Sequence, residues 1–92
     1  MSDFEKTHRY NTEFTKIHVH INRCTYDATF TAMYEWETNA CTPFWDCIGI
    51  DGLVLKCMNG EDVYDCFPSK VRRYVDEVCY QHSIHNTPPD PS

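Results

Sequence analysis

Apolar and polar residues alternate along two consecutive stretches in the first half of the chain. Residues 15–22 carry isoleucine or valine at every second position and mostly polar side chains between them. The stretch 26–37 repeats this pattern, and its apolar or aromatic positions are Tyr26, Ala28, Phe30, Ala32, Tyr34 and Trp36. Because successive side chains of a strand point to opposite faces, both stretches are predicted to be strands with one buried side. The short polar turn at 23–25 predicts that they pair as an antiparallel hairpin.

The alternation is interrupted after the second stretch. Residues 38–47 contain an asparagine, a proline, two cysteines and one adjacent pair of aromatic residues, and they are predicted to form a connecting loop. A third strand is predicted over 48–58. The pair Asn59 and Gly60 then supplies a turn that tolerates positive φ, and a short fourth strand is expected over 61–66.

A change of period marks the last part of the chain. Pro68 and Ser69 have the composition of a helix start, and from there apolar residues recur at spacings of three and four. The predicted buried stripe consists of Val71, Tyr74, Val75, Val78, Cys79 and His82. We expect the helix to end near His82, because 83–92 contains three prolines and no apolar period.

These elements predict a small α+β domain, in which an antiparallel sheet of three or four strands carries one C-terminal amphipathic helix on one face. Residues 15–82 would form this single domain, between a flexible N-terminal arm at 1–14 and a loose proline-rich tail at 83–92. One helix can cover only one face of such a sheet. The other face must therefore meet solvent, a second copy of the chain or a partner protein.

Composition predicts a soluble globular protein. The 92 residues are 41% hydrophobic and 14% aromatic, which is too rich for a disordered chain, and the mean hydropathy is −0.57. No apolar run is long enough to span a membrane, and residues 1–12 lack the apolar stretch of a signal peptide. We therefore expect a cytoplasmic protein with no membrane partner.

The negative charge is concentrated in the middle of the chain. Between Cys24 and Ser69 eight acidic residues stand against one base, Lys56, so this segment accounts for more than the whole net charge of −6. The same segment holds eight of the thirteen aromatic rings. Such a surface repels nucleic acid and favours a basic protein partner.

Eight residues of this segment are predicted to bind that partner. The carboxylates are Glu35, Glu37, Asp46, Asp51, Glu61 and Asp62, and the apolar anchors are Phe44 and Trp45. Two plainer interpretations stand beside this one. Acidic residues on the wet face of a sheet serve in many proteins only to solvate it, and a loop tryptophan often covers a small core.

The six cysteines are expected to be mostly buried free thiols, because a reducing compartment disfavours disulfides. Their spacing does not fit the two-residue knuckles of structural zinc sites. Cys79, His82 and His85 approach such a site on the last helical turns, with Cys41 or Cys47 as a fourth ligand. Zinc and disulfides stay open as alternatives, and no cofactor is predicted.

Three further groups carry weaker signals. His18 and His20 share one strand face and are interpreted as an exposed polar pair, with a metal site lacking its third ligand as the alternative. Lys70, Arg72 and Arg73 form a basic cluster that is either a solvated helix face or a phosphate contact. No cysteine has a defined base or oxyanion hole, so the chain is predicted not to be an enzyme.

One resemblance covers Phe30 to His82. This segment resembles small acidic accessory proteins of tailed bacteriophages in the order of its parts: a strand, a cysteine- or proline-bearing insert, a second strand, the step Gly-Glu-Asp-Val-Tyr-Asp at 60–65 and a terminal amphipathic helix. This resemblance implies a protein made in the bacterial host cytoplasm. It also makes plausible that the protein blocks a host defence or DNA-processing enzyme.

The predicted function is therefore that of a phage-type protein, in part a DNA mimic, that inhibits or redirects a host protein with a basic surface. Direct contact with nucleic acid is not expected in that case. Two alternatives come from other classes. One is a zinc-stabilised regulatory domain that contacts nucleic acid through its basic cluster, and the other is a homo-oligomeric structural protein.

Overall fold

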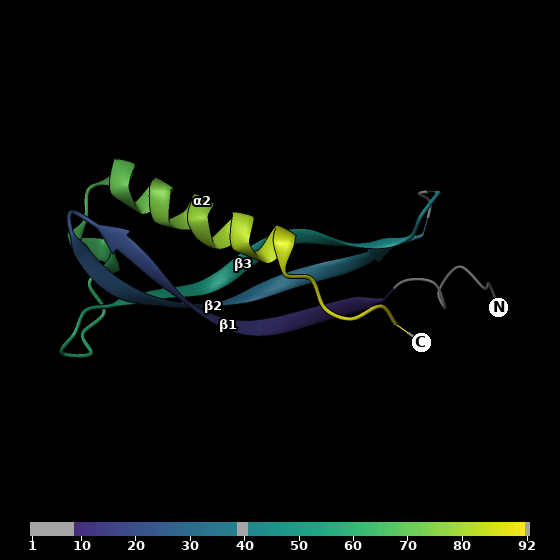
Figure 1. Cartoon of the computed structure of the whole chain (residues 1–92), viewed down its shortest axis with the longest axis horizontal. Coiled ribbons are helices and arrows are strands. Elements are labelled where there is room, and N and C mark those ends of the chain that lie inside the picture. The colour runs from purple at the N-terminus through teal and green to yellow at the C-terminus, as the bar shows by residue number, and fades with distance from the viewer. Residues whose placement is uncertain (1–8, 39–40, 92) are drawn as a thin grey trace.

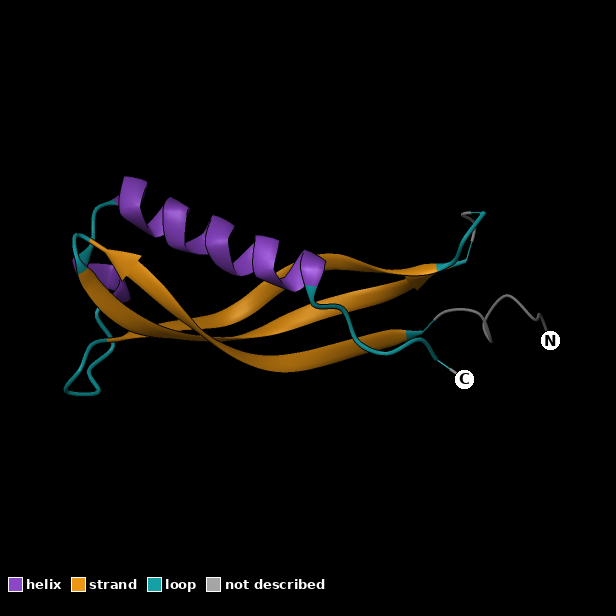
Figure 2. Cartoon of the chain, in the orientation of Figure 1, coloured by secondary structure: helices purple, strands orange, loops and turns teal. Residues whose placement is uncertain are grey.

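A three-stranded sheet and one long helix make up the fold in the computed structural model, which describes residues 9–38 and 41–91 (Figures 1 and 2). The elements in chain order are β1 (Tyr10–Ile21), β2 (Cys24–Glu37), β3 (Phe44–Lys56), the short 3₁₀ helix η1 (Tyr64–Cys66) and α2 (Ser69–His85). The sheet is an antiparallel meander in the order β1-β2-β3. The predicted α+β class, with its single C-terminal helix packed on the sheet, is confirmed.

The hairpin of β1 and β2 closes through a two-residue turn. Ile21 pairs with Cys24, and the intervening Asn22 and Arg23 have φ values of 50° and 70°. Positive φ at both central positions gives a turn whose twist matches that of the flanking strands. The predicted hairpin is confirmed, with the turn one residue earlier than expected.

Strand β1 begins five residues before the predicted start. Tyr10 already pairs with Glu35, and the Trp36 amide donates a hydrogen bond to the Arg9 carbonyl at 2.8 Å. Residues 10–14 therefore belong to the sheet and not to an arm; residues 1–8 of the expected arm lie outside the described residues. The sequence did not reveal this part of the strand, because it has no buried face. The residues around Phe14 are polar, and Phe14 itself is 76% exposed.

Strand β3 also begins earlier than predicted, so the assignment of 44–47 to a loop was wrong. Trp45 pairs with Trp36, and Asp46 pairs with Glu35. Trp45 and Cys47 are buried while their neighbours are exposed, which is the alternation of a strand. The stretch is too short, and too close to Pro43, for that alternation to stand out in the sequence.

The fourth strand does not form. Residues 61–66 contain one isolated bridge, between Lys56 and Asp62, and then the 3₁₀ helix η1. Asp62 explains the outcome, since its Oδ1 accepts hydrogen bonds from the backbone amides of Leu55 and Tyr64, each at 3.1 Å. The Asp62 side chain thus binds the Leu55 amide, which a fourth strand beside β3 would have needed for its own hydrogen bonds.

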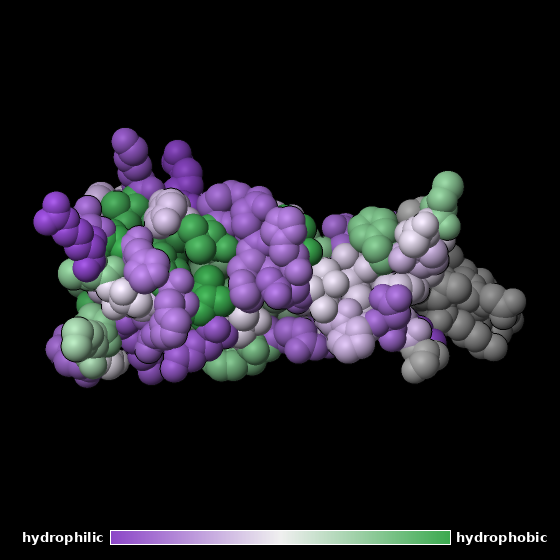
Figure 3. Space-filling model, in the orientation of Figure 1, coloured by the Kyte–Doolittle hydropathy of each residue, from purple (hydrophilic) through white to green (hydrophobic). Residues whose placement is uncertain are grey.

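The helix α2 lies across one face of the sheet, which we call the inner face (Figure 1). The core between them contains Val19, Ile21, Ala28, Phe30, Ala32, Tyr34, Trp45, Cys47, Leu55, Val75 and Cys79. On the side seen in Figure 3, strongly apolar side chains show between polar ones in the half of the molecule where the helix lies. The helix extends three residues past the predicted end, to His85.

The tail beyond α2 is not loose. Pro88 is buried, and the Trp45 indole Nε1 donates a hydrogen bond to the Pro89 carbonyl at 2.9 Å. The tail therefore continues the cover of the inner face past the end of the helix. The outer face is covered by none of the described elements, and none of the described helices is long and apolar enough to cross a membrane.

Candidate functional site

A row of three side chains crosses the outer face near one end of the sheet. Tyr10 on β1, Glu35 on β2 and Asp46 on β3 are direct cross-strand partners. A hydrogen bond and the charge of Glu35 raise the pKa of the Tyr10 hydroxyl, because ionising Tyr10 would place two negative charges together. Glu35 and Asp46 are like charges in directly opposed positions, an arrangement that destabilises a sheet.

Phe44 and Trp45, predicted together as apolar anchors, point to opposite faces. Phe44 pairs with Glu37 on the outer face and is 46% exposed. Trp45 is only 8% exposed, and its ring packs edge-on against Trp36 with centroids 5.1 Å apart. Trp45 therefore covers the core, as the plainer interpretation expected, and is not a freely exposed anchor.

A groove lies beside the free edge of β3 at this end, which we call the edge groove, and its volume is about 370 Å³. The sequence prediction contained three of its lining residues, Phe44, Trp45 and Asp46. It missed the residues that α2 and the tail contribute, chiefly Tyr80, Ile84 and Asp90. Asp90 lies between two prolines, which restrict the backbone around it. These prolines were the one feature of the sequence that could have pointed to Asp90.

The other predicted carboxylates lie elsewhere. Asp51 is opposite Thr31 in the middle of the outer face, whereas Glu61 and Asp62 follow the turn after β3 at the far end. Asp27, toward the other end of β2, is eight residues from Glu35, or roughly 26 Å at about 3.3 Å per residue. The predicted acidic surface is thus divided, and Asp62 holds a turn together rather than offering a free carboxylate.

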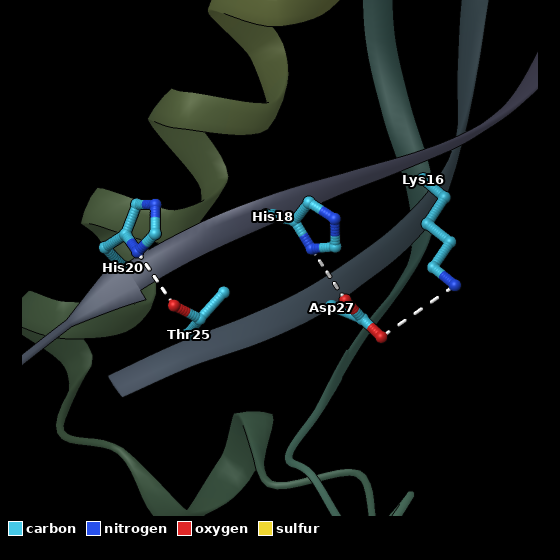
Figure 4. A network of polar contacts seen from close by, with 5 residues as sticks. All are labelled: Lys16, His18, His20, Thr25 and Asp27. Atoms are coloured by element: carbon cyan, nitrogen blue, oxygen red, sulfur yellow. Dashed lines mark hydrogen bonds and ion pairs between the residues drawn. The ribbon is translucent and has the colours of Figure 1, made fainter. Parts of the chain in front are cut away.

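Asp27 continues the acidic side of β2 but is engaged by bases of β1 (Figure 4). Its carboxylate is 2.8 Å from His18 Nδ1 and 3.8 Å from Lys16 Nζ. His20 Nδ1 is instead 3.0 Å from the Thr25 hydroxyl. Each histidine therefore has its own partner on β2, and the two rings do not converge on one point.

The six cysteines are free thiols, but the expectation that most of them are buried was wrong, since only Cys47 and Cys79 are buried. Burial raises the pKa of the Cys79 thiol to about 11 and also raises the pKa of the Cys47 thiol. Cys24 and Cys57 line a second open pocket, of about 550 Å³, at the turn end of the hairpin. Residues 9–38 and 41–91 contain no group of three or more His, Cys, Asp or Glu side chains that could hold a metal ion.

The basic cluster at the start of α2 is partly used within the fold. Arg72 Nη1 donates a hydrogen bond to the Phe67 carbonyl at 2.5 Å, just before the helix begins. Lys70 and Arg73 are exposed, with Asp76 one turn further on. This arrangement agrees with the interpretation of the cluster as a solvated helix face.

Fold and groove together define a small α+β domain with an acidic, aromatic groove at a sheet edge. No protein-family model, no curated protein and no solved structure matches the chain. The resemblance to small accessory proteins of tailed bacteriophages therefore stays a prediction.

Proposed function

We propose that this protein is a non-enzymatic binding protein that inhibits or redirects a partner with a basic surface. The observation that carries the proposal is the direct opposition of Glu35 and Asp46 on the outer face, beside the edge groove. A bacteriophage origin, action in the bacterial cytoplasm and a host enzyme of defence or DNA processing as the target are the narrower form of this proposal.

The opposition of Glu35 and Asp46 has an energetic cost. Opposed like charges on adjacent strands destabilise a sheet by a few tenths of a kcal/mol or more, and a lysine at either position would remove that cost. Residues whose placement lowers the stability of the fold occur mainly at functional sites. A cationic partner that contacts Glu35 and Asp46 together would interact with two carboxylates held side by side by the register of β2 and β3.

The partner is expected to associate rapidly and in a salt-dependent way. A net charge of −6 on a chain of 92 residues attracts cationic surfaces over about 8–10 Å in physiological salt. The exposed Phe44 beside Asp46 adds apolar contact area at the same end. Charge would thus determine the rate of encounter, and the edge groove would hold the partner afterwards.

The test compares two double variants with equal change of charge. Glu35→Lys with Asp46→Lys alters the proposed site, and Glu61→Lys with Asp65→Lys alters exposed carboxylates near the other end. Each protein is immobilised and exposed to a bacterial lysate at low and then at high salt. We expect the wild type and the second variant to retain the same basic protein until high salt, and the first variant to lose it. Equal retention by both variants would contradict the proposal.

Self-association is the second candidate, because the outer face carries Tyr10 and Phe14 with exposures of 65% and 76%. Light scattering separates the two functions. A concentration-independent monomer mass favours the binding protein, whereas a dimer mass that Phe14→Ser reduces to a monomer mass favours assembly through the outer face.

A further inference from the structure

We propose that the edge groove receives a single arginine side chain of the partner, an inference that rests on the proposed function and names the group it recognises. The groove combines aromatic walls, an aliphatic side and two carboxylates. Its walls come from three separate segments: the start of β3, the last turns of α2 and the tail.

The aromatic walls are fixed before any ligand arrives. The Trp45 ring is held by its hydrogen bond to the Pro89 carbonyl at 2.9 Å and by its contact with Trp36. The Tyr80 hydroxyl donates to the Cys47 carbonyl at 3.2 Å, which ties the α2 side of the groove to β3. Rigid walls lower the entropy cost of binding, because little needs to be ordered when the ligand enters.

The charges in the groove have one sign. Asp46 extends from β3 and Asp90 from the tail, both are exposed, and none of the described residues that line the groove is basic. The second open pocket, at Cys24 and Cys57, differs in this respect because Arg23 is its only charged lining residue. A cation is therefore favoured in the edge groove and disfavoured in the other pocket.

Arginine matches this combination better than lysine. Its planar guanidinium stacks on aromatic rings, is weakly hydrated and forms paired hydrogen bonds with carboxylates. Its methylene groups would contact Phe44 and Ile84, which are 46% and 38% exposed at the sides of the groove. The ammonium of lysine is a compact and strongly hydrated charge, so it gains less from the aromatic walls.

The experiment uses the whole protein and three small probes: N-acetyl-arginine methylamide, its lysine counterpart and its citrulline counterpart. Citrulline has nearly the shape of arginine without the charge. The reporter is the ¹⁵N–¹H resonance of the Trp45 indole, assigned with a Trp36→Phe variant. We expect saturable shifts with arginine at millimolar concentration, a several-fold weaker response with lysine and none with citrulline.

Matched variants locate the probe. Asp46→Asn and Asp90→Asn should each weaken arginine binding by about two- to fivefold, whereas Asp65→Asn, an exposed carboxylate outside the groove, should leave it unchanged. Equal binding of citrulline or of lysine would overturn the inference, and so would unchanged binding in the Asp46→Asn and Asp90→Asn variants.

The two proposals can fail separately. The lysate experiment is repeated with Asp90→Asn, because this variant alters the edge groove and leaves both Glu35 and Asp46 unchanged. A basic protein that is lost with Glu35→Lys and Asp46→Lys, together with the absence of any arginine shift, would refute the groove inference and retain the proposed function. Specific arginine shifts without any captured basic protein would support the groove and count against the proposed function.

Discussion

The Tyr34 hydroxyl, at the inner face of β2, donates a hydrogen bond of 2.8 Å to the Ser83 carbonyl in the last turn of α2. The last four carbonyls of a helix have no amide partner within the helix, and Ser83 supplies one of them. The neighbouring His82 carbonyl is met by the Asn86 side-chain amide at 2.8 Å. Sheet and tail thus both terminate the helix.

Replacing Tyr34 by phenylalanine should lower the free energy of unfolding by about 1–2 kcal/mol, because it leaves the buried Ser83 carbonyl without this donor. The measurement is urea denaturation followed by circular dichroism. Tyr74→Phe is the matched control, since Tyr74 is 52% exposed and should change stability by less than about 0.5 kcal/mol. Equal losses in the two variants would show that the hydrogen bond does not stabilise the fold.

Replacing Asp62 by alanine should destabilise the protein by about 1–2 kcal/mol, because two backbone amides, those of Leu55 and Tyr64, lose their acceptor. Asp62→Asn keeps an acceptor oxygen at the same position and should lose less than half as much. Thermal unfolding of both variants checks this prediction. A similar loss in both would assign the effect to the charge of Asp62 and not to its hydrogen bonds.

Stability should fall between about pH 9 and pH 12. Burial raises the pKa of Cys79 from 9.0 to about 11, and burial together with the hydrogen bond to Asp76 raises the pKa of Tyr64 from 10.0 to about 12. Both groups are neutral when protonated, so the unfolded chain releases these protons first as the pH rises. Their contribution to stability is complete below pH 9 and is lost as the pH rises through the folded pKa values.

Denaturation of the wild type and of Tyr64→Phe at several alkaline pH values tests this dependence. The variant cannot ionise at position 64, so above about pH 11 its stability should decline less steeply than that of the wild type. Constant or rising stability across the range would contradict the prediction for both groups.

The cysteines should fall into two kinetic classes toward a thiol reagent. Cys24, Cys41 and Cys66 are exposed and should react within seconds, whereas Cys47 and Cys79 are buried and should react only as the fold opens. Mass spectrometry after timed quenching identifies which sites have reacted. The urea-unfolded chain is the control, in which all six cysteines should react at similar rates; rapid modification of Cys79 in the folded protein would refute the assignment.

The sequence predicted those elements whose period is carried by many residues. Alternation over 26–37 predicted β2, and the stripe of α2 was recognisable because its apolar residues recur at helical spacing. Shorter or more polar stretches gave no such signal. Residues 10–14 have no buried face of their own, and they became part of β1 because β2 is long enough to pair with them.

The candidate site was only partly predictable for a related reason. Phe44, Trp45 and Asp46 are consecutive in the chain, so composition marked them, but composition could not show that strand geometry sends Trp45 to the opposite face. Asp62 stood among the acidic residues, yet two amides that only the folded chain brings together give it a structural role.

By itself the sequence determined the α+β class, the hairpin, the amphipathic helix and the acidic and aromatic character of the middle segment, since these depend on local period and composition. Tertiary structure decided the register that opposes Glu35 and Asp46. It also decided the edge groove, whose walls meet through contacts such as that between Trp45 and Pro89, 44 positions apart. Local propensity contains no information about such pairings, because they form only where two distant surfaces can exclude water together.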